Sequence, residues 1–310
     1  MPPDTSTAER LDTWSEAGQP AFLRSLDRLR INVGGGTTLH PGNNPVAMAT
    51  QDSGLEFAKH RPYTPGDDLR HIDWNALARH DTKLVKTFRA EREAPLHLLI
   101  DNSGSMASPV GDCKPLAAAA LAACLAYISL RNRDPVRVGI LDHNGARHIA
   151  PLLRHPQRVP LLVQGLASTR ASGPTDLESG VAAYLRITRL PGVAIVLSDF
   201  LVPPANYQHA LHALLASGYQ VAALRLLGPG EQNPHAHTRR IRVFDVESRR
   251  DRMIDFTPEH RARYRKTLDE HTFGLHSWCK TNGIPFCVID TGQPPSAAVT
   301  RALTGAGVLR

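Results

Sequence analysis

A carboxylate and two hydroxyls stand at alternate positions in the segment Asp101-Asn102-Ser103-Gly104-Ser105. Asn and Gly favour a tight loop, and such a loop can turn side chains two residues apart toward one point. Magnesium takes six oxygen ligands in near-octahedral array at roughly 2.0–2.1 Å and usually keeps several waters. The segment would supply half of such a shell, although Ser, Gly and Asn are equally typical of an ordinary turn.

Two later residues are further candidate ligands. Asp199 follows the apolar run 193–197, and Thr175 lies in a turn ahead of a helical stretch. Both have structural alternatives, because a hydroxyl or carboxylate just before a helix commonly caps it. Thr175 would then cap the helix that follows it, and Asp199 the helix that begins near residue 203.

Uninterrupted apolar runs precede both carboxylates. Residues 96–100 and 193–197 show no alternation, which is typical of strands buried on both faces of a parallel sheet. Ligands in open α/β sheets bind outside the carboxyl ends of strands, where neighbouring strands lead the chain in opposite directions. We therefore expect Asp101 and Asp199 to meet at this topological switch point.

Strand-like and helical segments alternate through the rest of the chain. This order predicts an α/β fold, doubly wound, with a mainly parallel sheet, one antiparallel edge strand and an N-terminal extension. The expected helices are 116–130, 156–168, 176–188, 204–216, 258–281 and 295–304. The expected strands are 136–141, 147–152, 193–198, 219–226, 241–246 and 285–289, with a polar loop at 228–238 and a turn-rich segment at 247–256.

Three parts of the chain differ in character. Residues 1–54 combine a helical pattern at 5–30 with a flexible linker, because Gly34-Gly35-Gly36 lacks both the ending of a phosphate loop and a preceding strand. Residues 55–93 form a block with a strand-like stretch at 84–89 that we expect to pack on the sheet domain, which is 94–310.

The candidate ligands also carry a resemblance. Taken in chain order, they resemble the metal-ion-dependent adhesion site of von Willebrand factor A domains. The resemblance implies that Ser103, Ser105 and Thr175 bind Mg2+ (or Mn2+) through hydroxyls, and that Asp101 and Asp199 bind it directly or through water. It further implies an open coordination position, which a carboxylate from a partner protein completes.

A second resemblance lies upstream of the sheet domain. The segment 61–74, with Ala78-Arg79 and Lys86-x-Phe88-x-x-Glu91, resembles the bacterial domain-of-unknown-function 58 family, whose members are typically encoded beside MoxR-type AAA+ ATPases. The likeness runs from about residue 55 to the end of the chain, and it implies an adaptor for such an ATPase. The motif residues are Arg61, Tyr63, Gly66, Asp67, Asp68, Arg70, Asp73 and Trp74. Their charges, together with Arg79, favour an ion-pair network that fixes this block, with a partner-binding surface as the alternative.

A metal-dependent hydrolase that uses Asp101 and Asp199 is the alternative function. An aspartyl-phosphate enzyme typically has a second acid two residues after its nucleophile, where this chain has Ser103. The segment also lacks the G-x-S-x-G elbow of a serine hydrolase. A metal-free scaffold is the third possibility, so the prediction is a non-enzymatic binding module with these two alternatives open.

Composition limits the partners and the location. The net charge is +7 over 310 residues, but acidic residues are interleaved with the basic clusters near 239–242, 249–252 and 261–266, so we expect no nucleic acid partner. The longest uncharged run, 115–130, is short for a membrane span and favours a core helix. Four cysteines without metal-site spacing predict reduced thiols, and the N-terminal residues lack a signal pattern, so we expect a cytoplasmic protein.

Overall fold

The computed structural model divides the chain into two compact units, Thr38–Glu93 and Met1–Thr37 with Ala94–Arg310. We call these the smaller and the larger unit, and describe each by itself. The residues described are 20–33, 55–65, 67, 70, 72–80, 82–90, 95–142, 144–174, 176–188, 190–233, 240–244, 251–255 and 257–310. The predicted glycine linker and residues 5–19 of the predicted N-terminal helix lie outside them.

The smaller unit is a β-hairpin with one short helix. Strands β1 (Leu55–Pro62) and β2 (Leu84–Ala90) pair antiparallel, with an irregularity between Phe57 and Lys59. Helix α3 (Trp74–His80) begins after Asp73, whose Oδ1 accepts hydrogen bonds from the backbone N–H groups of residues 75 and 76 at 3.0 and 3.1 Å. The strand β2 was predicted, whereas β1 and α3 were not, because charged and turn-forming residues hide their periodicity.

The larger unit is built on a six-stranded sheet with the order β10-β7-β6-β3-β4-β5. All neighbouring pairs are parallel except β4 with β5, which is antiparallel. This arrangement confirms the predicted doubly wound α/β fold with one antiparallel edge strand. The strands are β3 (Leu96–Asp101), β4 (Val136–Asp142), β5 (Gly145–His148), β6 (Val193–Ser198), β7 (Gln220–Leu227) and β10 (Phe286–Asp290).

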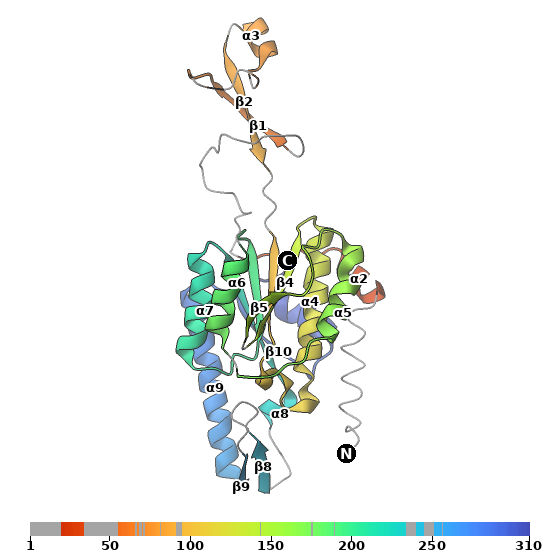
Figure 1. Ribbon diagram of the computed structural model, residues 1–310, viewed down its shortest axis with the longest axis vertical. Helices are drawn as coiled ribbons and strands as arrows, with labels where there is room; N and C mark the ends of the chain where they lie inside the picture. Colours follow the sequence, from red (N-terminus) through yellow and green to blue (C-terminus); the bar gives the residue numbers. More distant parts are fainter. Residues whose placement is uncertain are drawn as a thin grey trace. The chain divides into compact units, whose positions relative to one another are not determined.

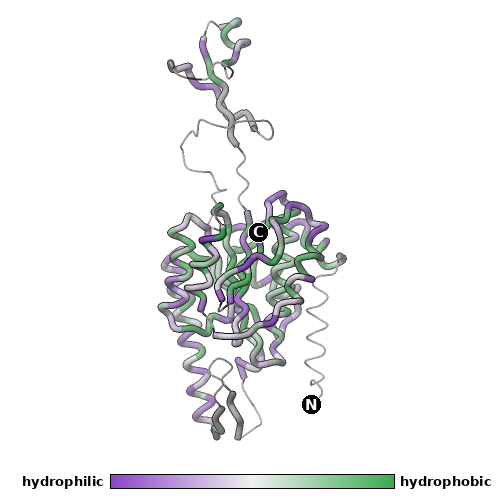
Figure 2. Tube along the Cα trace, viewed as in Figure 1, coloured by the Kyte–Doolittle hydropathy of each residue, from purple (hydrophilic) through white to green (hydrophobic). Residues whose placement is uncertain are grey.

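Helices cover both faces of this sheet (Figure 1), and each face buries its own hydrophobic cluster. One face packs against α2 (Pro20–Ser25), α4 (Lys114–Arg131), α5 (Val159–Ala167) and the π-helical turn η5 (Ala297–Leu303). The other packs against α6 (Leu177–Ile187), α7 (Pro204–Ala216) and α9 (Pro258–Thr281). In Figure 2 the central strands are mostly hydrophobic, whereas α9 carries many hydrophilic residues.

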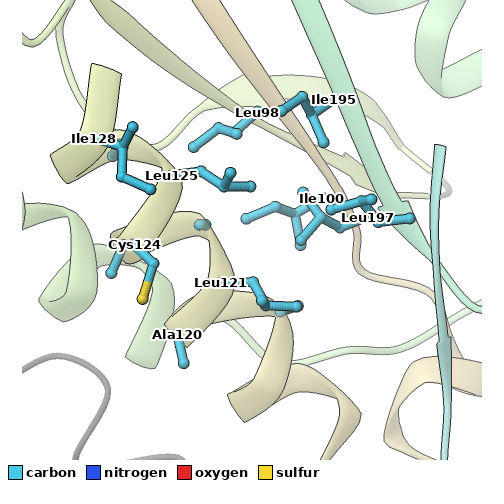
Figure 3. Packing of buried hydrophobic residues seen from close by; sticks show 14 of the residues in the cluster. Leu98, Ile100, Ala120, Leu121, Cys124, Leu125, Ile128, Ile195 and Leu197 are labelled. Atoms are coloured by element: carbon cyan, nitrogen blue, oxygen red, sulfur yellow. The ribbon is translucent and has the colours of Figure 1, made fainter. Parts of the chain in front are cut away.

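Helix α4 is the central helix of the first face. By length and composition alone it could cross a membrane, but most of its residues are buried inside the larger unit. Figure 3 shows Leu121 and Leu125 of α4 on the side of the helix that lies toward Ile100 and Leu98 of β3. Six alanines of α4 are also buried, and their small side chains allow a helix to pack closely against its neighbours.

Several predicted elements differ from the structure. The helix predicted to reach residue 30 ends at Ser25, and the chain then pairs Ile31 with Leu309 in an isolated bridge. The edge strand β5 ends at residue 148 rather than 152. The segment expected to be turn-rich contains β9 (Asp251–Asp255), paired with β8 (Arg240–Phe244), and the expected loop contains the short helix α8 (Pro229–Gln232).

Candidate metal centre

Two neighbouring strands carry the candidate carboxylates to one edge of the sheet. Strands β3 and β6 are parallel and in register from Leu96 opposite Val193 to Ile100 opposite Leu197. Asp101 is the last residue of β3, and Asp199 follows the last residue of β6. From here the chain continues to β4 on one side and to β7 on the other, so the two carboxylates lie at the switch point of the sheet.

Asp101 is held by hydrogen bonds to both of its carboxylate oxygens. Its Oδ1 accepts from the backbone N–H of Ser103 at 2.9 Å, and its Oδ2 accepts from the Ser198 hydroxyl at 2.6 Å. Burial, followed by the charge of Asp199, raises the pKa of Asp101 to about 6. The carboxylate is therefore oriented by neutral donors and sits beside a second negative charge.

The two serine hydroxyls bridge the carboxylates. Ser103 Oγ lies 3.1 Å from Ser105 Oγ, and Ser105 Oγ donates to Asp199 Oδ1 at 3.3 Å. Adjacent ligands of an octahedral magnesium ion, each roughly 2.0–2.1 Å from the metal, are about 3.0 Å from one another. These two spacings are close to the edge length of such a shell, and the oxygen-only donor set suits a hard divalent cation.

Thr175, the remaining predicted ligand, lies outside the described residues. The segment before it is tied to the Asp101 loop by two backbone hydrogen bonds, from Gly104 N–H to the Gly173 carbonyl at 2.8 Å and from the Ser172 N–H to the Asn102 carbonyl at 3.0 Å. Helix α6 is capped by Asp176, whose Oδ1 accepts from the Ser179 N–H at 3.0 Å. The cap that sequence reasoning gave to Thr175 is therefore made by its neighbour.

Asp199 is paired with a buried lysine. The Lys114 ammonium donates to Asp199 Oδ2 at 2.9 Å and to Glu231 Oε1 at 2.5 Å. Lys114 and Asp199 side chains have no exposed surface. Asp199 Oδ1 also accepts from the Leu201 N–H at 3.2 Å, whereas the residue before α7 is Pro203, so Asp199 does not cap that helix.

Glu231 is itself fixed by the chain around α8. Its Oε2 accepts from the Gly228 N–H at 3.1 Å, and the Asp112 carboxylate accepts from the N–H groups of Gly230 and Glu231 at 2.7 and 3.1 Å. A Cβ atom on Gly228 would lie 2.0 Å from Asp112 Oδ2, so only glycine fits there.

Burial raises the pKa of Glu231, although the positive charge of Lys114 opposes this shift. Burial also lowers the pKa of Lys114, but the two carboxylates outweigh it, and the net direction is upward.

A second buried cation lies in the same region. Arg225 stands in the apolar strand β7, and one of its guanidinium nitrogens donates to the Thr272 hydroxyl of α9 at 2.7 Å. Burial lowers the pKa of Arg225, while Glu231 and Asp199 raise it. Lys114 and Arg225 are thus two buried cations in the neighbourhood of the buried carboxylates of Asp199 and Glu231.

Sequence reasoning missed Lys114, Glu231 and Arg225. Two signals were present in the chain. Lys114 stands at the start of an apolar helix, where the partial positive charge of the helix N-terminus disfavours a cation, and Arg225 interrupts an otherwise apolar strand. Each pattern indicates a buried polar partner, but neither identifies which residue it is.

The smaller unit contains the other predicted motif residues. The Arg61 guanidinium forms a bidentate ion pair with Asp67, donating to Oδ2 at 2.7 Å and to Oδ1 at 2.5 Å. The His60 Nε2 lies 2.8 Å from Asp73 Oδ2. The ion pair with Arg61 holds the pKa of Asp67 well below its usual range. Among the remaining motif residues, Tyr63 is half-buried and Arg70 and Trp74 are exposed, while Gly66 and Asp68 lie outside the described residues.

Other metal chemistry finds less support in the described part of the chain. No group of three or more His, Cys, Asp or Glu side chains that could hold a metal ion occurs there. The four cysteines, Cys113, Cys124, Cys279 and Cys287, are free and buried, which confirms the prediction of reduced thiols. The proposed donor set around Asp101 differs from such groups because three of its five residues, Ser103, Ser105 and Thr175, would bind through hydroxyls.

Together, the sheet order and the loop at Asp101 define a doubly wound α/β domain with a candidate cation site at its switch point. A family model described as "Protein of unknown function DUF58" matches residues 59–273, so the chain belongs to this family, as its motif residues predicted. Uncharacterized proteins of Mycobacterium tuberculosis and Mycobacterium bovis are each 28% identical over 253 residues, which cover 80% of this chain and 78% of the relative.

Two solved structures are similar to this chain in fold but share little sequence with it. A von Willebrand factor type A structure from Catenulispora acidiphila is 17% identical with a TM-score of 0.37, over 73% of this chain and 44% of that chain. The conserved hypothetical protein BatB from Bacteroides thetaiotaomicron is 13% identical with a TM-score of 0.37, over 69% of this chain and 98% of that chain. The fold class of the present chain rests on its own sheet order.

Proposed function

We propose that this chain is a non-catalytic interaction module that binds a partner protein through Mg2+ or Mn2+. The ligands are Asp101, Ser103, Ser105, Thr175 and Asp199. The partner is a MoxR-type AAA+ ATPase, for which the chain serves as a cytoplasmic adaptor. The observation that carries the proposal is the convergence of the Ser103, Ser105 and Asp199 oxygens, at spacings of 3.1 and 3.3 Å, beside Asp101.

The chemistry of this donor set favours a bridge to an acidic group. When bound, the ion would supply a divalent charge with room for a further ligand at the rim of the sheet. The serine hydroxyls are neutral, so only Asp101 and Asp199 offset that charge. A carboxylate from a partner would meet the cation in a partly desolvated site, where the effective dielectric is below that of water and the attraction is stronger.

The family supports the choice of partner, and affinity capture tests it. Tagged protein is incubated with a purified MoxR-type ATPase in magnesium and again in chelator. We expect capture in magnesium only, and weaker capture by Ser105→Ala because a ligand hydroxyl is lost. Ser168→Ala is the matched control, since Ser168 is exposed and donates to the Gly165 carbonyl of its own helix. Equal capture in chelator, or by Asp101→Ala, would show that no ion bridge is formed.

A metal-dependent hydrolase remains the second candidate, motivated by the raised pKa of Asp101, which is a property of many catalytic acids. The geometry gives it less support, because both oxygens of Asp101 accept hydrogen bonds within the protein. Turnover of phosphoester or peptide substrates that requires magnesium and is lost in Asp101→Asn would establish an enzyme. Metal-dependent capture without turnover would favour the interaction module.

A further inference from the structure

Lys114 places a fixed positive charge beside the candidate ion site. Its ammonium lies 2.9 Å from Asp199 Oδ2, while Asp199 Oδ1 faces the Ser105 hydroxyl at 3.3 Å. One carboxylate therefore serves the lysine with one oxygen and the candidate site with the other. A divalent ion bound at Oδ1 would share this carboxylate with the ammonium.

The position of Lys114 gives no advantage to its own helix. It is the first residue of α4, where the helix dipole disfavours a positive charge. Moving an ammonium out of water is costly and is offset only by well-placed partners. The two carboxylates supply this offset, and Glu231 is kept in place by the Gly228 N–H and by the contacts of Asp112 to α8. The ammonium is thus held beside Asp199 by Glu231, whose own position is fixed by hydrogen bonds.

Electrostatics gives the consequence for ion binding. Like charges a few ångströms apart repel strongly when water is excluded, and a cation that is already paired with a carboxylate reduces the attraction of that carboxylate for a second cation. Asp101 accepts its hydrogen bonds from a backbone N–H and a hydroxyl, so neither of these contacts brings a competing cation to it. The two carboxylates are therefore unequal ligands.

We infer that Lys114 is a built-in counter-ion that competes with the divalent ion for Asp199 and keeps the ion affinity of the site low. This inference rests on the proposed metal site and adds a residue that tunes it. Lys114 contacts Asp199 rather than the ion, so it acts on the ion through that carboxylate. Removing Lys114 should therefore change the affinity of the site for the ion, whereas removing a purely structural lysine would change only the stability of the fold.

The test compares two variants that differ only in the lysine. Glu231→Gln keeps the ammonium, and Lys114→Met/Glu231→Gln removes it together with one acid, so that the formal charge of the pair stays balanced. Methionine is unbranched and adapts to an apolar gap of this length. Dissociation constants for Mn2+ are measured from the free-ion signal in electron paramagnetic resonance, with Mg2+ as competitor, on protein shown to be folded by circular dichroism.

The expected order of affinity is specific. Glu231→Gln should bind Mn2+ about threefold or more weakly than the unmodified protein, because the ammonium then acts on Asp199 alone. The double variant should bind about tenfold or more tightly than Glu231→Gln, because the competing charge is gone. If the double variant does not fold, the loss of affinity in Glu231→Gln supports the inference, and an unchanged affinity overturns it.

Two results distinguish failure of the inference from failure of the site. Equal or weaker Mn2+ binding by the double variant, compared with Glu231→Gln, overturns the inference, since Lys114 would then orient Asp199 for the ion. Absence of Mn2+ binding by every protein at millimolar concentration overturns the proposed site itself, and the inference with it.

Discussion

Strand β3 carries a buried polar group near each end, and the two are accommodated in opposite ways. At its carboxyl end Asp101 lies beside a charged cluster in which Lys114 joins Asp199 and Glu231. Near its amino end His97 is equally buried but lies among aromatic rings. Its Nδ1 is 2.7 Å from the Tyr184 hydroxyl, and the Tyr219 ring is 5.0 Å away, edge to face. The cluster beside Asp101 contains paired charges, whereas the cluster around His97 consists of neutral side chains.

The histidine cluster stays neutral because burial, followed by the charge of Arg137, lowers the pKa of His97 to about 4. Tyr184 reaches it because Gly139 lacks a side chain, since a Cβ atom there would lie 2.5 Å from the tyrosine ring. A buried ionisable group can therefore be accommodated either by pairing it with an opposite charge or by keeping it neutral. Only the paired cluster contains buried cations, and the candidate ion site lies beside it.

Removing the lysine of the charged cluster should cost the most stability. Lys114→Met leaves Asp199 and Glu231 buried without their shared ammonium, and breaking a buried ion pair on one side costs roughly 3–5 kcal/mol. Urea unfolding at neutral pH measures this loss. Lys280→Met, at an exposed position in the last turn of α9, is the matched control. A loss similar to that of the control would mean that the charges are not coupled.

The next largest change should come from lowering the pH, which should reduce the stability contributed by the buried His97. The folded-state pKa of His97 is depressed to about 4 from an ordinary value of 6.5. The unfolded chain therefore binds the proton first, so this contribution is present above about pH 6.5 and is lost as pH falls toward 4, by roughly 3 kcal/mol in total. His97→Phe should show a flatter pH dependence of the unfolding free energy over this window. Parallel pH profiles for the two proteins would exclude this role.

The elements that the sequence predicted well are those with local signals. Helices α7 and α9 match their predicted bounds because proline at the first turn marks each start and the apolar period continues to each end. Strand β9 was missed because its five residues include charges at Asp251, Arg252 and Asp255, which are typical of a turn region.

The residues of the candidate site also differ in whether a local sequence signal predicts them. Asp101 and Asp199 could be assigned to one edge from the rule for strand ends, and Ser103 and Ser105 from their spacing. The contact of Lys114 with Glu231 joins residues 117 positions apart, so only the folded chain brings them together. Short-range patterns therefore predict the hydroxyls and carboxylates, whereas the lysine that modifies one of them is a property of the fold.

Addition of the ion should sharpen the contrast between the two ends of β3. Binding to the folded state alone adds RT ln(1 + [L]/Kd), about 2.7 kcal/mol when the ion is at 100 times its Kd. Magnesium or manganese should raise the melting temperature of the metal-free protein and of His97→Phe equally. Asp101→Ala and Ser103→Ala should fold but show no such rise, because each lacks a ligand. A melting temperature that millimolar ion does not change would count against the site.

The smallest expected effect separates the two carboxylates themselves. In chelator at pH 7 Asp101 is ionised in a buried place beside Asp199, and its raised pKa means that the charge costs stability there. Asp101→Asn keeps an oxygen for the Ser103 N–H and removes the charge, so the free energy of unfolding should increase by about 1 kcal/mol. Asp199→Asn should instead decrease it, because the Lys114 ammonium loses one of its two anionic partners. Urea unfolding of both variants in the same buffer decides the matter. Equal losses in the two would mean that Asp101 and Asp199 are held alike, and the inequality on which the role of Lys114 depends would disappear.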